Sequence, residues 1–425
     1  MDVLRGLIGL LILVGICFLL SNDRKKINWR IVLIGITIQL VLAFVLIKIE
    51  YARKAFEYVV GFFSMMINSS QQSAQFLFGD LAKPGSTFGF AFLVLPTIIF
   101  FSALSSLLYY LGILQRIVSG FAWLMRRTMQ LSGAESLSAA ANIFVGQTEA
   151  PLIIKPYLEG MTRSELLCMM VGGMATIAGS VFGAYMAMLG GDDPQGRIYF
   201  GMHLLTASII SAPAAIICAK LLIPETEKFK ESADVPKDQV GTSVLDALAR
   251  GTTDGLMLAV NVAAMLLAFM AFVYLTNLFL TNFGSITGLN SLVSQWTGGI
   301  QKEFNLQYIL GIIFSPLAWV IGINSVDVLQ IGRLLGEKTI LNEFVAYLSL
   351  ADMKNANLLE PRSVIIATYA LCGFSNFASI GIQIGGVSVL APGQRKNLTE
   401  LGVRALIGGT IACLMTACVA CMIGV

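Results

Sequence analysis

The segment 142–151 (N-I-F-V-G-Q-T-E-A-P) places an amide, a hydroxyl and a carboxylate between apolar runs. A carboxylate at bilayer depth costs about 2.5–3.5 kcal/mol on insertion scales, so it usually faces a protein interior or a water-filled cavity. Gly146 and Pro151 flank Glu149, and both weaken a helix. Two interpretations remain open: the tip of a re-entrant hairpin that holds a polar solute, or a surface loop in which Glu149 is solvated.

A second polar group lies about 200 residues further along the chain, again between apolar residues. Asn342 and Glu343 interrupt one apolar run, and the segment 374–379 (F-S-N-F-A-S) interrupts another. The alternative for Asn376 and Ser379 is a purely structural role, because helix–helix hydrogen bonds within a membrane bundle contribute about 0.6–2 kcal/mol.

Together these side chains favour an uncharged, polar ligand. Two carboxylates and several amides disfavour an anion, since we expect no buried cation near them. Carboxylates accept charge-assisted hydrogen bonds from hydroxyls, and Gln147 can both donate to and accept from the amide edge of a heterocycle. Phe374 offers an aromatic face, or else fills the core. Freed backbone carbonyls and side-chain oxygens could hold a small hard cation such as Na⁺ at Asn142, Val145, Thr176 and Ile177.

The composition indicates an all-α integral membrane protein. Of 425 residues, 56% are hydrophobic and only 12% are charged, and the mean hydropathy is +0.79. The net charge of +3 is too small and dispersed to favour nucleic acid. No hydrolase, P-loop or dinucleotide motif is present, and His203 is the only histidine, so we expect no enzyme activity. The seven cysteines lie in apolar runs, which argues against disulfides.

Apolar runs of membrane-spanning length occur along the whole chain. Val3–Leu20 indicates a retained first helix rather than a signal peptide, because a basic cluster follows it. Tyr51–Phe78 is amphipathic and is predicted to lie in the interface. The charged segment 224–241 is placed in the cytoplasm. The other apolar runs are Ile31–Ile49, Phe88–Ile113, Leu166–Leu189, Tyr199–Leu222, Leu256–Leu280, Tyr308–Ile323, Val364–Ile384 and Leu406–Val425.

Comparing the chain with itself reveals an internal repeat. Asn142 matches Asn342, and Gly173 matches Gly373, both at an offset of 200 residues. Basic residues precede the helix of the first copy but follow that of the second, so the positive-inside rule gives the copies opposite orientations. An inverted repeat requires an odd number of membrane crossings between equivalent points of the two copies. One apolar run between Leu256 and Ile323 therefore does not cross completely, and we suspect that Leu256–Leu280 is partly interfacial.

This organisation divides the chain into five regions. They are 1–87 (N-terminal spans and an interfacial helix), 88–222 (first repeat, with a re-entrant hairpin near 120–160 and a broken helix), 223–253 (cytoplasmic linker), 254–307 (central scaffold or interfacial region) and 308–425 (second repeat, with a hairpin near 328–354 and a broken helix).

Three motifs also resemble those of the concentrative nucleoside transporters. They are G-Q-T-E-A-P-L at 146–152, G-x-K-x-x-x-N-E-F-V-A-Y at 336–347 and G-F-S-N-F-A-S at 373–379. The resemblance extends from the first span to the last helix and is closest to the short bacterial form. It implies about eight transmembrane helices, two re-entrant hairpins in inverted repeats and interfacial helices. It also implies a homotrimer in the inner cell membrane that imports nucleosides such as uridine with Na⁺ by an elevator-like movement.

The same resemblance implies roles for individual residues. Those implied to face the nucleobase are Gln147, Thr148 and Glu149. Those implied to face the ribose are Glu343, Asn376 and Ser379, with Phe374 and Val181 lining the pocket. The implied sodium ligands are Asn142, Val145, Thr176 and Ile177.

Several alternatives remain. Some bacterial relatives use protons, so a proton-coupled nucleoside symporter is the first alternative, and a transporter of another neutral polar solute is the second. A glutamate-type transporter needs a cation for its anionic substrate. A channel is expected to show pore-lining repeats. An intramembrane hydrolase needs a nucleophile–base pair or an aspartate pair, which the sequence does not show.

Overall fold

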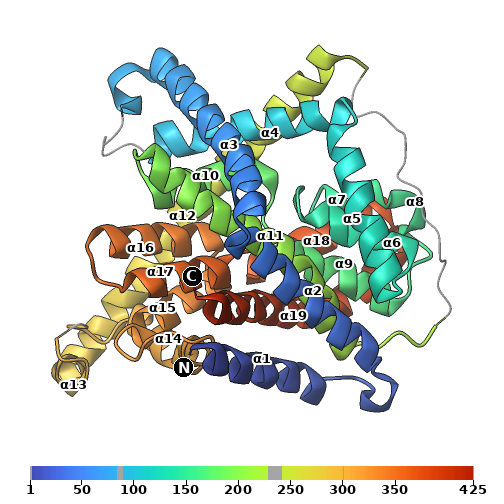
Figure 1. The fold of residues 1–425 in the computed structure, drawn as a ribbon. Coiled ribbons are helices and arrows are strands. Elements are labelled where there is room, and N and C mark those ends of the chain that lie inside the picture. The colour runs from blue at the N-terminus through green and yellow to red at the C-terminus, as the bar shows by residue number, and fades with distance from the viewer. Residues whose placement is uncertain (1, 84–89, 228–241, 300, 425) are drawn as a thin grey trace.

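The computed structural model describes residues 2–83, 90–227, 242–299 and 301–424, and every regular element in these ranges is a helix (Figure 1). The all-α prediction is therefore confirmed for the described part of the chain. The Lys-rich part of the predicted linker, 228–241, lies outside the described residues.

The N-terminal helices pack on the late helices of the chain. They are α1 (Asp2–Leu19), α2 (Trp29–Lys48) and α3 (Glu50–Phe78), with short turns η1 (Arg24–Lys26) and η2 (Gly79–Ala82). The Asn28 side chain caps α2 by accepting from the backbone N–H of Arg30. Helix α1 packs against α19 (Arg395–Ile423), and α2 packs against α11 (Pro194–Leu222) (Figure 1).

Helix α4 (Leu95–Tyr110), which follows the short π-helix η3 (Phe90–Val94), packs closely against α12 (Val244–Thr287). A Cβ atom at Gly255 would lie 2.7 Å from Ser102 Cβ, so glycine permits this close approach. Helix α12 has 44 residues and is therefore about 66 Å long at 1.5 Å per residue.

The length of α12 bears on one sequence-based suggestion, which stays a prediction because a helix of about 66 Å is longer than the membrane core of about 30 Å. Leu256–Leu280, suspected of being partly interfacial, is the middle of this continuous helix, which is long and apolar enough to cross a membrane. Helix α14 (Leu306–Val320) has only 15 residues.

The remaining helices form two sets that each contain short and interrupted helices. The first set is α5 (Ile113–Met129), α6 (Gly133–Asn142), α7 (Ala150–Ile153), α8 (Lys155–Leu158), α9 (Arg163–Ala175), α10 (Gly179–Gly190) and α11. The second is α13 (Leu289–Trp296), α14, α15 (Val328–Ile340), α16 (Glu343–Asn355), α17 (Pro361–Leu371), α18 (Phe377–Leu390), η4 (Pro392–Gln394) and α19.

Burial separates central helices from peripheral ones. In the most apolar 18-residue segment of the α9–α10 stretch 94% of the residues are buried, and the same holds for α11, whereas in that of α12 only 18% are buried. Six helical stretches of the described part are long and apolar enough to cross a membrane. Their apolar outer faces are suited to lipid, while the central helices are surrounded by protein.

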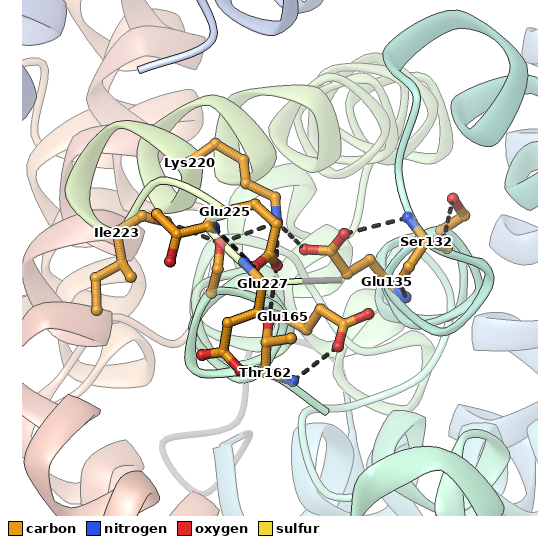
Figure 2. A network of polar contacts seen from close by, with 11 residues as sticks. Ser132, Glu135, Thr162, Glu165, Lys220, Ile223, Glu225 and Glu227 are labelled. Carbon is orange, nitrogen blue, oxygen red and sulfur yellow. Dashed lines mark hydrogen bonds and ion pairs between the residues drawn. The ribbon is translucent and has the colours of Figure 1, made fainter. Parts of the chain in front are cut away.

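A buried polar cluster joins the N-terminal ends of α6 and α9 to the C-terminal end of α11 (Figure 2). Ser132 with Glu135 caps α6, and Thr162 with Glu165 caps α9, in two reciprocal capping boxes. The Lys220 ammonium on α11 pairs with Glu135. Because this lysine is 5% exposed, its carboxylate partner offsets the cost of burying the charge. The cluster therefore fixes α6, which leads to the first polar segment, relative to α9 and α11.

Candidate functional site

The first polar segment forms the non-helical connection between α6 and α7. Helix α6 ends at Asn142, and α7 begins at Ala150, next to Pro151. Gln147 is buried, Thr148 is exposed and Glu149 is half-buried. The Glu149 carboxylate accepts a hydrogen bond from the backbone N–H of Gly146 at 3.3 Å, so it closes its own loop.

This connection is tied to the interruption between α9 and α10. The backbone N–H of Gly179 donates to the Phe144 carbonyl at 2.9 Å. A Cβ atom at Gly179 would lie 2.7 Å from that carbonyl oxygen, so the contact requires glycine. Ser208 on α11 donates to the Ile143 carbonyl at 2.9 Å and accepts from the Ile177 N–H at 3.3 Å. The segment and the interruption thus form one structural unit.

The second polar group begins α16. Asn342 caps this helix by accepting from the backbone N–H of Val345 at 2.9 Å, and Glu343 is its first residue. The Glu343 carboxylate is 3% exposed. It accepts from the hydroxyl of Tyr185 on α10 at 3.2 Å and from the side-chain amide of Asn376 at 2.9 Å.

Asn376 lies in the interruption between α17 and α18, where it caps α18 by accepting from the Ser379 N–H at 2.9 Å. Gly373 reverses the chain there with φ +85°, a conformation that favours glycine. A Cβ atom on Gly373 would lie 2.5 Å from the carbonyl carbon of Ala175. The interruptions of the two helix sets therefore touch directly.

A continuous chain of hydrogen bonds connects the two sets. The Gln383 amide donates to Gln147 Oε1 at 3.0 Å, and the Gln147 amide donates to Ser379 Oγ at 3.0 Å. Ser379 is linked through its backbone to Asn376, which donates to Glu343. The structure thus brings together four of the predicted site residues, of which Gln147 and Ser379 are 232 positions apart in the sequence.

The other predicted substrate residues lie around this chain. Val181 is 1% exposed on α10, four residues before Tyr185 and hence on the same helix face. Phe374 is half-buried in the α17–α18 interruption. Thr148 and Glu149 are not part of this hydrogen-bond chain, because none of their described hydrogen bonds is made to one of its members.

The sequence-based prediction did not include Gln383, Tyr185 or Ser208, all of which make hydrogen bonds at the candidate site. Gln383 follows Ser379 by four residues in α18, and Tyr185 follows Val181 by four residues in α10. Helical spacing from the predicted residues was the signal that could have found the first two. Ser208 lacked such a signal, because its role depends on where α11 passes the Ile143 carbonyl.

One further expectation was wrong. Lys338, within the second motif, is a buried cation, 2% exposed, only five residues before Glu343. Its ammonium donates to the carbonyls of Ala370 and Cys372 at 3.1 and 2.8 Å. The absence of a nearby buried cation therefore cannot be used to exclude an anionic ligand.

The predicted ion ligands lie where the helices of the first set are interrupted: Asn142 ends α6, Val145 follows in the α6–α7 connection, and Thr176 and Ile177 separate α9 from α10. Asn142 is 1% exposed, and neither of its side-chain polar atoms has a hydrogen-bond partner among the described residues. A buried amide without partners is costly, so a ligand for it is expected. Within the described ranges, no backbone N–H donates to the carbonyls of Val145 or Ile177. Thr176 Oγ1 donates to the Gly172 carbonyl at 2.9 Å and keeps acceptor capacity.

A cavity of about 70 Å³ lies between α4, α10 and α11, and Ile177 and Ser208 are among the residues that line it. Its lining is mainly apolar, with hydroxyls only from Ser105 and Ser208. Such a cavity cannot satisfy a sugar or a heterocycle, because it offers too few polar partners. The polar chemistry lies instead along the Gln147–Glu343 chain.

Family models match three stretches of the protein: "Na+ dependent nucleoside transporter C-terminus" at 203–421, "Nucleoside recognition" at 91–192 and "Na+ dependent nucleoside transporter N-terminus" at 8–81. The first covers more than half of the chain. The chain belongs to the Na⁺-dependent, concentrative nucleoside transporter family. It is therefore a multi-pass membrane transporter and not an enzyme.

Individual relatives agree with this assignment. An uncharacterized transporter of Haemophilus influenzae is 40% identical over 99% of this chain and 97% of its own length. Solute carrier family 28 member 3 of mouse is 39% identical over 97% of this chain and 58% of its own length. CNTnw in an inward-facing, substrate-bound state is 38% identical, with a TM-score of 0.87 over 100% of this chain and 98% of that chain. A CNTnw variant in an intermediate state gives a TM-score of 0.90 at 37% identity.

Proposed function

We propose that this transporter imports nucleosides such as uridine by symport with Na⁺, and that it binds them where the interruptions of the two helix sets meet. The observation that carries the proposal is the hydrogen-bond chain Gln147–Ser379–Asn376–Glu343, which is buried and draws on both sets. Its amides, hydroxyl and carboxylate are the groups that a heterocycle and a ribose require, so a nucleoside can replace these internal contacts with its own.

The second set supplies the ribose side. Glu343 already accepts hydrogen bonds from Tyr185 and Asn376, which shows that its carboxylate oxygens face polar donors. The two vicinal hydroxyls of a ribose can donate to this carboxylate with charge-assisted strength. Asn376 and Ser379 orient it and complete the ribose contacts.

The first set supplies the nucleobase side. Gln147 is held by Gln383 and Ser379, so its amide has a defined orientation and can pair with the polar edge of a base. Thr148 and Glu149 follow it at the edge of the site. Val181 and Phe374 offer the apolar and aromatic surface on which a base can lie.

Sodium would be held by Asn142, Val145, Thr176 and Ile177. The unpartnered buried amide of Asn142 supports this assignment, because its oxygen needs a ligand. No group of three or more His, Cys, Asp or Glu side chains suited to a metal exists among the described residues, so amide, hydroxyl and carbonyl oxygens are the available donors. The ion supplies the charge that responds to the membrane potential, worth about 2.3 kcal/mol per 100 mV.

The architecture of the proposed carrier is that of an inverted repeat with two re-entrant hairpins, α6–α8 and α15–α16, in a homotrimer that moves its substrate by an elevator-like step. The interruptions after Ala175 and Leu371 lie close to the 200-residue offset of the repeat, which supports it. Proton coupling, or transport of another neutral polar solute, remains the alternative.

A binding measurement tests the proposal. Purified protein is titrated calorimetrically with uridine in sodium buffer, in choline buffer and in choline buffer at lower pH. We expect heat of binding in sodium and a large loss of affinity in choline at either pH. Binding that is restored by acid without sodium would favour the proton-coupled alternative, and no binding of any nucleoside would refute the proposal.

A further inference from the structure

Lys338 is a buried cation beside the candidate site, and neither the substrate contacts nor the ion contacts proposed above give it a role. Moving an ammonium group out of water costs several kcal/mol unless its charge and its N–H groups are compensated. With 2% exposure, Lys338 must therefore obtain that compensation from the protein.

The compensation comes from the end of α17. Lys338 Nζ donates to the carbonyls of Cys372 at 2.8 Å and Ala370 at 3.1 Å. The last carbonyls of a helix have no partner within the helix and carry the negative end of its dipole, so an ammonium group is stabilised there. Cys372 leads directly into Gly373 and the interruption that carries Asn376. Lys338 thus fixes the C-terminal end of α17 through two hydrogen bonds.

In the first helix set, the equivalent carbonyls at the end of a helix accept hydrogen bonds from uncharged groups. The carbonyls of Met170 and Gly172 stand 200 residues before those of Ala370 and Cys372. They accept from neutral donors, the amide of Gln383 at 3.0 Å and the hydroxyl of Thr176 at 2.9 Å. At these matching positions, only the second set carries a fixed positive charge.

The two acids consequently lie in different electrostatic surroundings. The charge of Lys338 acts favourably on the ionised Glu343 carboxylate, which Tyr185 and Asn376 also contact. The charge that acts on Glu149 is instead the like charge of Asp254 on α12. The second set thus contains a protein cation that favours its acid, whereas the charge acting on the acid of the first set is of like sign.

We propose that Lys338 is a positioning residue for nucleoside binding: its ammonium fixes the end of α17 and balances Glu343, so the ribose side of the site is formed without a bound ion. The nucleobase side, in the first set, depends on the cation. This inference rests on the proposed function, because it takes Glu343 as the group that meets the ribose hydroxyls.

The unmodified protein provides the first test. Dissociation constants of uridine and 2′,3′-dideoxyuridine are measured by calorimetry with and without Na⁺. We expect both dissociation constants to rise when Na⁺ is removed. Their ratio should stay within twofold of its value in Na⁺, because the ribose side of the site is already formed without the ion. A ratio that collapses without Na⁺ would overturn the inference. Failure of uridine to bind in either buffer would instead refute the proposed function.

Three variants provide the second test. Lys338→Met keeps the length of the side chain without its charge, Lys338→Arg keeps the charge, and Lys220→Met removes another buried lysine far along the chain from Glu343. At saturating Na⁺, Lys338→Met should raise the KM for uridine about tenfold, because the end of α17 loses its ammonium partner and Glu343 loses the charge that balances it, which weakens the hydrogen bonds that Glu343 accepts from the ribose. It should also reduce the preference for uridine over the dideoxy compound.

The control variants separate positioning from general destabilisation. Lys220→Met should lower the melting temperature and leave the uridine preference unchanged, and Lys338→Arg should retain the preference. The half-saturating Na⁺ concentration should change less than twofold in Lys338→Met. A Lys338→Met protein that keeps the wild-type preference, or that loses Na⁺ affinity instead, would contradict the inference. If that variant does not fold, the ratio measured on unmodified protein decides.

Discussion

The Glu343→Gln substitution tests the ribose side of the proposed site with little change in shape. Gln differs from Glu only in an amide group that replaces one carboxylate oxygen. Its remaining oxygen can still accept from Asn376, which donates to the carboxylate at 2.9 Å. Its new N–H group can donate to the Tyr185 hydroxyl, which lies at 3.2 Å from the other oxygen. The internal contacts are therefore largely preserved, and the charge is lost.

The size of the effect follows from the hydrogen bonds to substrate. A hydrogen bond to a charged group contributes about 1.5–3 kcal/mol, against about 0.5–1.5 kcal/mol for a neutral pair. Losing the charge at two ribose hydroxyls therefore costs about 2–3 kcal/mol. That is a factor of about 30 to 150 in affinity.

The assay is the initial rate of labelled uridine uptake into proteoliposomes at saturating Na⁺, over a range of uridine concentrations. We expect Glu343→Gln to raise the KM by this factor, and to abolish uptake at low uridine concentration, with normal expression. Glu337→Gln is the matched control, because Glu337 is 3% exposed and pairs with Arg333 on α15. A Glu343→Gln protein with wild-type KM, or an equal loss in both variants, would refute the reasoning.

Three further substitutions have defined outcomes. Asn142→Ala should raise the half-saturating Na⁺ concentration about tenfold, with the uridine KM at saturating Na⁺ changed far less, as measured by Na⁺-dependent uptake. Gln383→Leu removes the donor that holds Gln147, and the loss of about 1 kcal/mol should raise the uridine KM about fivefold in the same assay. Gly373→Ala should destabilise the protein by about 2 kcal/mol or more, because φ is +85° and its Cβ would lie 2.5 Å from Ala175. A melting temperature equal to that of wild type would contradict this last expectation.

Local sequence indicated much of the candidate site. Polar residues that interrupt apolar runs are costly in a membrane, so Gln147, Glu343, Asn376 and Ser379 stood out one by one. The structure brings these four into a single hydrogen-bond chain. Their roles toward a nucleoside and an ion stay predictions, since proximity alone does not identify a ligand.

Other features depended on tertiary packing that sequence patterns do not contain. A lysine in an amphipathic segment is usually solvated, and Lys338 is buried only because the end of α17 reaches its ammonium. Ser208 acts at the site because α11 passes the Ile143 carbonyl.

The most direct test of the central claim is accumulation of labelled uridine in proteoliposomes under an inward Na⁺ gradient. If the two helix sets together bind a neutral nucleoside and a sodium ion, uridine should rise transiently above its external concentration, and an inside-negative potential should increase the peak. Without the gradient, uridine should only equilibrate. Equal accumulation under a proton gradient in sodium-free buffer, or no accumulation under a Na⁺ gradient, would contradict the account.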